Sequence, residues 1–390
     1  MTNKLILISK LVFFTEENEL IEKNLRICDL FSDANIILAI VARQSTINIL
    51  KSKLPEEYKK KIKLLNRSKD TEAKIKDLKE RGIIIGMVGI VNEDALFSFH
   101  CKIPLFNPES LSNRVTVSEK VEKYGLPIYD FKDVIDCLKA YEIHKQNYFQ
   151  MIFGDSFSVI SLNNANTHYR PEEEARVKKI FETNLKGIES KREQRILLLL
   201  LFHLINEVTT NSYYEKVDYW GTFPSSNPQN TFTSVSFLKE AVRVILNGGP
   251  KKGPEILLRH QQMPAKHNSG AIRLKTKSNN DFETLIVNPA LKNNIKGKVI
   301  CIIDDYITNG YSAEATKHLL LAAGAKEVIF LSFGKFGKKY FSTDYLIEGD
   351  VYSKYTYEFI KENLYEGNFG KEIFYNSNND SEISNFADLI

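Results

Sequence analysis

Short apolar runs alternate with longer polar stretches through the first 150 residues of the chain. The apolar runs carry no charged residue and are typical of buried strands; they are Leu5 to Ile8, Ile36 to Val41 and Ile83 to Val91. The polar stretches are rich in Lys and Glu and have helical character; they are Glu19 to Phe31, Thr46 to Leu54, Asp70 to Arg81 and Asp133 to Ala140. This alternation predicts an α/β domain over residues 1–150.

The chain becomes polar and charged after this first domain, and we expect a helical linker over residues 151–210. Pro171 suits the first turn of a helix in which Glu172 to Lys191 would form an exposed face. Ile196 to Val208 is apolar on nearly all sides and predicts a buried helix that packs on a domain. We interpret His203 within that helix as a core or capping histidine rather than a ligand.

Residues 296–325 show the clearest pattern in the second half of the chain. Val299 to Ile303 is short and mostly β-branched, as expected of a strand covered on both faces in a parallel sheet. Two adjacent acids, Asp304 and Asp305, would end this strand, and a helix is expected over about residues 312–324. Strand, acidic pair, loop and helix in this order predict a ligand-binding loop, here within a second α/β domain.

The loop after the acidic pair has the features of a phosphate site. Ile307 to Ser312 would lie at the carboxyl end of a parallel strand and at a helix N-terminus, where free N–H groups and the helix dipole favour a phosphate. Thr308 and Ser312 can add hydroxyl donors, and Gly310 permits close approach or a positive φ. The two carboxylates would repel the phosphate itself, so they fit better beside sugar hydroxyls or a metal ion. A ribose 5-phosphate moiety fits this pattern.

This stretch resembles the signature of the type I phosphoribosyltransferases. The signature is an apolar strand, two acids, two variable residues, Thr-Thr-Gly or a close variant, and a hydroxyl residue that opens the helix. The chain supplies Ile302-Ile303-Asp304-Asp305-Tyr306-Ile307-Thr308-Asn309-Gly310-Tyr311-Ser312. Asn309 and Tyr311 replace residues that are usually small or hydroxylated. The resemblance covers roughly residues 215–340 and implies a type I phosphoribosyltransferase-like parallel sheet, in a domain over residues 211–375, preceded by the first α/β domain.

The resemblance implies an enzyme that uses 5-phosphoribosyl 1-pyrophosphate and Mg²⁺ as a pentosyl donor and cofactor. Asp304 and Asp305 would hold the ribose hydroxyls and the metal. The loop that would hold the 5-phosphate consists of Ile307, Thr308, Asn309, Gly310, Tyr311 and Ser312. Nothing in the sequence resembles a purine or pyrimidine recognition signature, so the acceptor is unknown.

Two further segments stand where this family binds pyrophosphate. Ser225, Ser226 and Asn227 lie in a Pro-, Ser- and Asn-rich loop and could donate hydrogen bonds there; an ordinary turn is the alternative. Arg259 and Arg273 belong to a basic segment, and in relatives of the competence-protein ComF group an Arg-bearing segment with a mobile loop occupies this place. A guanidinium grips phosphate oxygens bidentately, whereas the alternative is a solvated loop.

The first domain faintly resembles the haloacid dehalogenase-like fold. Gly86 to Ala95 looks like the later loop in which acids of that fold hold magnesium, and Lys74 or Lys76 would stand for its lysine. The Asp-x-Asp of the first strand is missing, because no acid occurs between residues 1 and 14. Phosphatase chemistry is therefore not expected, and the domain would be a degenerate one used for binding or assembly. An unrelated α/β domain is the alternative.

Composition sets the remaining expectations. At 390 residues the chain exceeds the usual size of one domain, and its net charge of +4 gives no sign of a polyelectrolyte binder, although nucleic acid stays open as a partner. The four cysteines are widely spaced, as in reduced core residues of a cytoplasmic protein. The first apolar run lacks a small-residue cleavage site and predicts a strand, no run is long enough to span a bilayer, and residues 376–390 predict a mobile tail.

Two other functions remain open at this point. One is a non-catalytic module that senses the donor or a nucleotide through the same pocket and signals through the first domain. The other is a component of a bacterial stress or defence system that modifies a nucleotide or RNA. Whether the chain forms a homo-oligomer or binds a partner protein is equally open.

Overall fold

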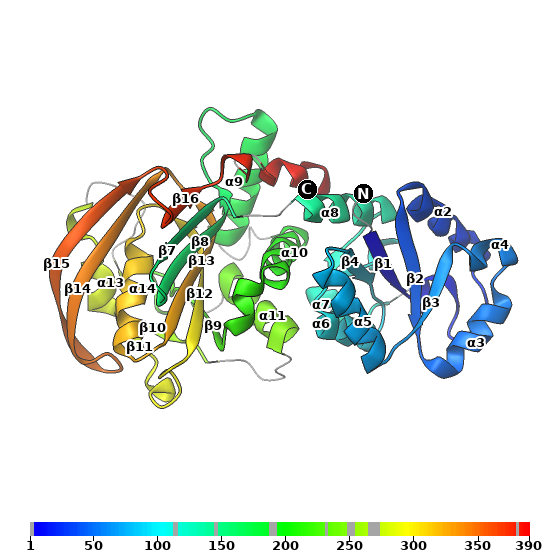
Figure 1. Ribbon diagram of the computed structural model, residues 1–390, viewed down its shortest axis with the longest axis horizontal. Helices are drawn as coiled ribbons and strands as arrows, with labels where there is room; N and C mark the ends of the chain where they lie inside the picture. Colours follow the sequence, from blue (N-terminus) through cyan, green and yellow to red (C-terminus); the bar gives the residue numbers. More distant parts are fainter. Residues whose placement is uncertain are drawn as a thin grey trace.

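The computed structural model describes residues 4–111, 116–143, 147–186, 193–230, 233–247, 254–263, 274–379 and 382–390. Two sheets lie at opposite ends of the elongated molecule, with helices between and around them (Figure 1). The protein is α/β, as expected, with a six-stranded, all-parallel sheet in its N-terminal part and a second, mixed sheet later.

The first sheet has the strand order β3-β2-β1-β4-β5-β6. Its strands are β1 (Lys4–Ser9), β2 (Ile36–Ala42), β3 (Ile62–Asn66), β4 (Ile84–Val88), β5 (Leu105–Asn107) and β6 (Leu126–Pro127). The three expected strands correspond to β1, β2 and β4, which lie side by side. This is the order of a doubly wound sheet, in which the direction of strand addition reverses between β1 and β4.

Helices cover both faces of this sheet. They are α1 (Lys10–Phe13), η1 (Glu22–Leu25), α2 (Arg26–Asp33), α3 (Gln44–Lys53), α4 (Glu56–Lys59), α5 (Lys69–Glu80), α6 (Asn92–Cys101), η2 (Glu109–Leu111), α7 (Glu119–Tyr124) and α8 (Phe131–Ile143). The four expected helical stretches correspond to η1 with α2, and to α3, α5 and α8. The end of the expected loop Gly86 to Ala95 is instead the first turn of α6.

The second sheet has the order β16-β7-β8-β13-β12-β9. Its strands are β7 (Phe149–Phe153), β8 (Phe157–Asn164), β9 (Tyr219–Thr222), β12 (Val299–Ile307), β13 (Glu327–Lys335) and β16 (Ile373–Tyr375). β8, β13, β12 and β9 are parallel, whereas β7 and β16 add an antiparallel edge. The expected helical linker is therefore wrong for β7 and β8, which belong to this sheet.

The other elements of the second half surround this sheet. They are α9 (Glu172–Lys186), α10 (Gln194–Thr210), η4 (Ser212–Lys216), α11 (Ser234–Asn247), β10 (Leu257–Arg259), α13 (Asn279–Thr284), β11 (Leu285–Val287), η6 (Pro289–Leu291), α14 (Tyr311–Ala322), β14 (Lys339–Asp350), β15 (Lys354–Glu366), η7 (Ser377–Asn379) and η8 (Glu382–Leu389). β10 pairs with β11, and β14 forms a long hairpin with β15.

Helix α10 is buried along its length, as its apolar sequence predicts, and joins the two halves. One continuous core contains residues of the first sheet, of α10 and α11, and of one face of the second sheet. His203 is fully buried in this core, with its Nε2 2.9 Å from Nδ2 of Asn163. Helix α9 differs from the expected exposed face, because it buries Val177, Phe181 and Leu185. A second core lies between the other face of the second sheet, α14 and the β14–β15 hairpin.

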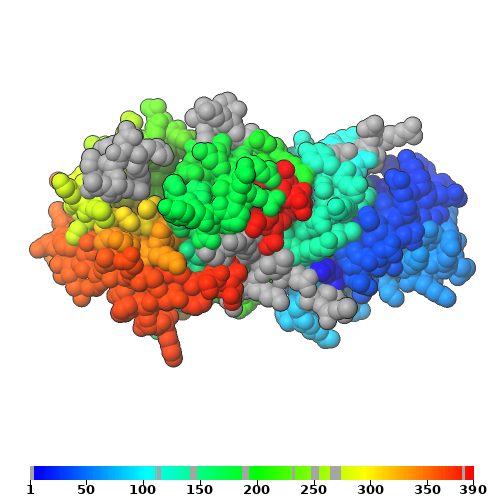
Figure 2. Space-filling model, turned by 90° about the horizontal axis from the view of Figure 1, so that it is seen from above, coloured from blue at the N-terminus to red at the C-terminus, as the bar shows by residue number. Residues whose placement is uncertain are grey.

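The C-terminal segment packs against the molecule. Ile383, Phe386 and Leu389 of η8 are buried in the first core, where they lie between α8 and α9. Figure 2 shows this segment in red, lodged between the green and cyan parts of the chain. The part of the expected mobile tail over residues 376–390 that the structure describes therefore packs against the fold, where its apolar side chains lose water contact.

No helix within the described ranges combines the length and apolar character that crossing a bilayer needs.

Candidate functional site

The two adjacent acids lie within strand β12 rather than at its end. Asp304 pairs in register with Ser332 of β13, and the strand continues until Ile307 pairs with Lys335. It runs past the expected end because β13 is long enough to offer partners there. Oδ1 of Asp304 accepts the N–H of Asp305 at 2.9 Å, and Oδ1 of Asp305 accepts the N–H of Tyr306 at 2.6 Å. Both carboxylates are partly exposed at the carboxyl edge of the sheet.

The loop from β12 to α14 turns at Gly310, a position where any other residue would be strained. Gly310 has a φ of +91° and is the N-cap of α14. A Cβ on this residue would lie 2.5 Å from the ring of Tyr340. That ring is held in place because the Tyr340 hydroxyl donates to Glu314 at 2.7 Å. The positive φ expected at Gly310 is confirmed.

A small, open pocket with about 20 Å³ of free volume lies over this loop. The residues that line it are Asp304, Tyr306, Ile307, Thr308, Asn309, Gly310, Tyr311, Ser312 and Ala313. Helix α14 has 12 residues and begins at the floor of the pocket, so its free N–H groups and dipole favour an anion there. The expected loop 307–312 and the first acid therefore share one pocket.

The buried ammonium of Lys335 forms hydrogen bonds with the main chain of this loop and of the following turn. Its Nζ donates to the main-chain carbonyl of Thr308 at 2.7 Å, and to those of Phe336 and Lys339 at 2.8 and 2.9 Å. Burial lowers the pKa of Lys335 to about 7. The site residues expected from the sequence did not include this lysine.

Tyr311 occupies a position where the signature has a small or hydroxylated residue, and its side chain is fastened to the β14–β15 hairpin. Its hydroxyl donates to Glu362 of β15 at 3.1 Å, and its ring stacks on Phe341 with 5.4 Å between centroids. Burial and the neighbouring Glu362 raise the pKa of Tyr311. Its main-chain carbonyl accepts a hydrogen bond from the Ser278 hydroxyl at 2.9 Å.

The loop with Ser225, Ser226 and Asn227 begins beside the acidic pair. Strand β9 is parallel to β12, with Thr222 opposite Ile303, and it ends one residue before Phe223. One donor of this segment is used within the loop itself, because the main-chain N–H of Asn227 donates to Oγ of Ser225 at 3.3 Å. The loop expected to bind the 5-phosphate and the loop expected to bind the pyrophosphate therefore follow two neighbouring strands, β12 and β9.

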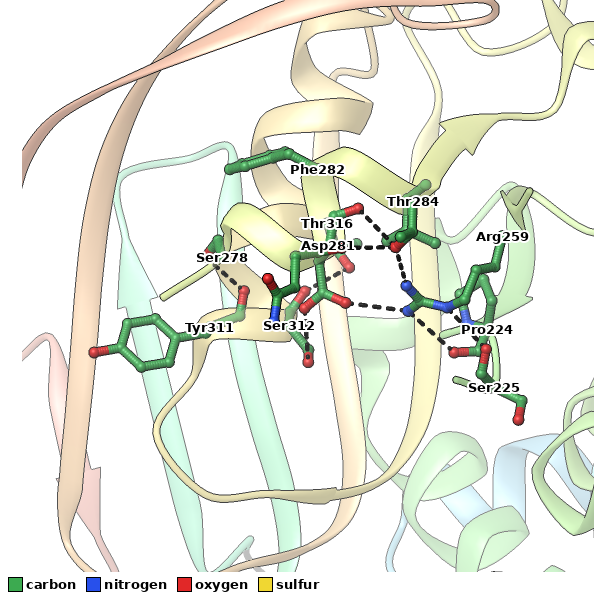
Figure 3. Close-up of polar contacts among 12 residues, drawn as sticks. Pro224, Ser225, Arg259, Ser278, Asp281, Phe282, Thr284, Tyr311, Ser312 and Thr316 are labelled. Atoms are coloured by element: carbon green, nitrogen blue, oxygen red, sulfur yellow. Dashed lines mark hydrogen bonds and ion pairs between the residues drawn. The ribbon is translucent and has the colours of Figure 1, made fainter. Parts of the chain in front are cut away.

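Arg259 does not lie on the surface, where a pyrophosphate ligand would be expected. Its side chain is fully buried, with Nε donating to the carbonyl of Ser225 at 2.8 Å and Nη2 lying 3.1 Å from Asp281 (Figure 3). Nη1 donates to the Thr284 hydroxyl. The expectation that Arg259 grips phosphate directly is wrong in this conformation, because protein acceptors surround its guanidinium. Arg273 lies outside the described residues.

Asp281 is a site residue that the sequence did not predict. It is buried in α13, and its carboxylate accepts from both Arg259 and the hydroxyl of Ser312. No motif marks it, because its importance arises from partners on two distant segments.

Asp94, in the segment that resembles the haloacid dehalogenase loop, is engaged by the protein's own groups. Among the residues that the structure describes, no group of three or more His, Cys, Asp or Glu side chains could hold a metal ion. The buried carboxylate of Asp94 accepts the N–H groups of Ile90 and Val91 at 3.0 and 3.1 Å and pairs with Arg67. Lys74 and Lys76 are exposed on α5. Asp94 therefore caps the start of α6, where the haloacid dehalogenase resemblance would have acids hold magnesium.

Comparisons of the chain with protein-family models, with curated proteins and with solved structures found no match. The function has to be argued from the geometry of the site.

Proposed function

We propose that the protein is a magnesium-dependent phosphoribosyltransferase that uses 5-phosphoribosyl 1-pyrophosphate and an acceptor not yet identified. The observation that carries this proposal is the pocket in which Asp304 lies beside a glycine-capped helix N-terminus. An anion site and a carboxylate side by side suit a phosphorylated sugar, because the phosphate needs donors and the sugar hydroxyls need acceptors. The type I phosphoribosyltransferase-like reading of the second sheet is part of the same proposal.

The acidic pair fits a metal that is shared with the donor. Mg²⁺ usually keeps several waters and binds through one or two carboxylates together with substrate phosphates. Asp304 and Asp305 supply two carboxylates from consecutive residues of β12, each with one oxygen that accepts a main-chain N–H, and Asp304 lines the pocket. They would hold the ion, which would supply charge neutralisation for the leaving pyrophosphate.

The residues of the chain then mainly bind and orient. The N–H groups and hydroxyls at residues 308–312 would hold the 5-phosphate, and the carboxylates would accept hydrogen bonds from the ribose hydroxyls. The loop at Ser225, which starts beside Ile303, would hold the pyrophosphate. In the reaction the bond from the anomeric carbon to pyrophosphate breaks while the bond to the acceptor forms, and the acceptor loses a proton. Positioning and charge stabilisation suffice, and no protein nucleophile is needed.

Calorimetric titration with 5-phosphoribosyl 1-pyrophosphate and Mg²⁺ tests the proposal. The parent protein is expected to bind, and the Asp304→Asn, Asp305→Asn double variant to lose at least tenfold in affinity. Asp218→Asn is the matched control, because Asp218 lies at the amino end of β12 and accepts the N–H of Val299 at 2.9 Å. No binding by the parent, or equal binding by the double variant, would overturn the proposal.

One observation favours a sensing module over an enzyme. Tyr311 is buried and fastened to Glu362 in a loop that transferases keep free of large side chains. A sensor would bind the donor without consuming it, whereas an enzyme releases pyrophosphate with some acceptor. A coupled pyrophosphate assay across nucleobases, amines and RNA separates the two once donor binding is established.

A further inference from the structure

A single buried carboxylate lies between the two loops of the proposed site. Oδ1 of Asp281 accepts from Nη2 of Arg259 at 3.1 Å, and Oδ2 accepts from the hydroxyl of Ser312 at 3.4 Å. In Figure 3 the side chain of Asp281 lies between Arg259 on one side and Ser312 on the other. Ser312 belongs to the loop that lines the pocket, at the first turn of α14.

The other bonds of Arg259 reach the opposite loop. Its Nε donates to the main-chain carbonyl of Ser225 at 2.8 Å, and its Nη2 lies 3.5 Å from the carbonyl of Pro224. Side chains therefore connect the loop at Ser225 with the loop at Ser312, in the order Ser225, Arg259, Asp281, Ser312.

Because the Arg259–Asp281 ion pair is buried, it should respond to small chemical changes in either side chain. The side chains of Arg259 and Asp281 are 0% and 5% exposed, so the two opposite charges compensate each other inside the protein. A guanidinium can hold several acceptors at once in a fixed plane. A lysine keeps the charge but cannot reach the carbonyl of Ser225 and the carboxylate of Asp281 in the same geometry.

We propose that Arg259 and Asp281 are positioning residues that couple the loop for the 5-phosphate to the loop for the pyrophosphate; this rests on the proposed function. When the Ser312 hydroxyl turns to a phosphate, the Asp281 carboxylate loses that donor and relies more on Arg259, whose Nε holds the carbonyl of Ser225. Occupation of one loop therefore changes how firmly the other is held, so neither residue needs to touch the donor.

A double-mutant cycle in ligand affinity tests the coupling. Arg259→Lys, Ser312→Ala and the combined variant are titrated with ribose 5-phosphate, with inorganic pyrophosphate and with 5-phosphoribosyl 1-pyrophosphate, each with Mg²⁺. Arg259→Lys is expected to weaken ribose 5-phosphate binding at least threefold, although Arg259 contacts the other loop. In the Ser312→Ala background that effect should largely disappear. Asp281→Asn, which keeps the size of the side chain, should behave as Arg259→Lys does.

A control and a fold check separate positioning from mere stability. Arg67→Lys weakens another arginine–aspartate pair, with side chains 19% and 0% exposed, in the first half of the chain, and should leave all three affinities unchanged. Thermal unfolding of every variant is measured beside the titrations. If Arg259→Lys and Asp281→Asn lower only the unfolding temperature, or if the two effects simply add, the proposal is overturned. A parent that binds no donor would instead overturn the proposed function, and this inference with it.

Discussion

The Lys335 ammonium donates to the main-chain carbonyl of Thr308 across 2.7 Å, beneath the loop that lines the candidate pocket. The same Nζ reaches the carbonyls of Phe336 and Lys339, so one cation ties the loop after β12 to the turn between β13 and β14. Its side chain lies in the interior of the protein, with the rings of Phe149 and Tyr375 at 5.6 and 6.0 Å. The shape of the loop therefore depends on the hydrogen-bond donors of one buried amine.

Replacing that lysine should damage both stability and the loop. Lys335→Met keeps the length of the side chain but leaves buried carbonyl oxygens without their donor, so we expect a loss of about 2–4 kcal/mol in the free energy of unfolding. Donor affinity should fall as well, because the carbonyl of Thr308 is no longer held. Lys338→Met, at an exposed position of the same turn, should change stability by less than about 0.5 kcal/mol. Urea unfolding followed by fluorescence of Trp220 checks both.

The same lysine predicts how stability depends on pH. Burial lowers the pKa of Lys335 to about 7 in the folded protein, whereas an unfolded lysine titrates near 10.4. Between these values the unfolded chain holds a proton that the folded chain lacks. The contribution of this group to the free energy of unfolding therefore rises with pH, by at most about 1.4 kcal/mol per pH unit. That gain is lost again as the pH falls to 7. Denaturant titrations from pH 6 to 10 should show this rise in the parent and a flatter profile in Lys335→Met; parallel profiles would contradict it.

Alanine substitutions at Gly310 and Gly297 separate the cost of backbone strain from the cost of steric overlap. Gly310→Ala combines a φ of +91° with a Cβ that would lie 2.5 Å from the Tyr340 ring. Gly297→Ala is a matched control, because its φ is +75° but nothing lies within 4 Å of its added Cβ. Both should lose about 1 kcal/mol from left-handed strain, and Gly310→Ala a further 1–3 kcal/mol from overpacking. Only Gly310→Ala should weaken donor binding; an equal loss of stability in both variants would show that Tyr340 moves aside freely.

The features that the sequence predicted well are those set by one contiguous stretch. An apolar run, a glycine and a helical repeat follow one another in β12, the loop and α14, so each local signal supports the next. β3 was missed because Lys63 interrupts its apolar run. As an edge strand, β3 pairs only with β2 and tolerates a charged side chain there.

The features that the sequence did not predict depend on partners that are far away in the chain. β8 reads as polar because of residues such as Ser161 and Asn163, yet both are buried. Ser161 bonds to Ser332 at 2.6 Å, and Asn163 donates to the carbonyl of Phe333 at 3.1 Å. In the same way an arginine at position 259 suggested a phosphate ligand. Its actual acceptors lie 34 and 22 residues away in the chain, which no local pattern contains.

The last prediction concerns the acid that caps helix α6. Asp94→Asn keeps the shape of the side chain but leaves the guanidinium of Arg67 without its counter-charge, so we expect a loss of about 3–5 kcal/mol in the free energy of unfolding. Neighbouring Glu93→Gln, whose side chain is half exposed, should be nearly neutral. Because Asp94 lies in the first half of the chain, donor affinity should not change while the variant is folded. Unfolding curves with and without Mg²⁺ decide its role: stabilisation of the parent by Mg²⁺ that Asp94→Asn abolishes would contradict a purely structural one.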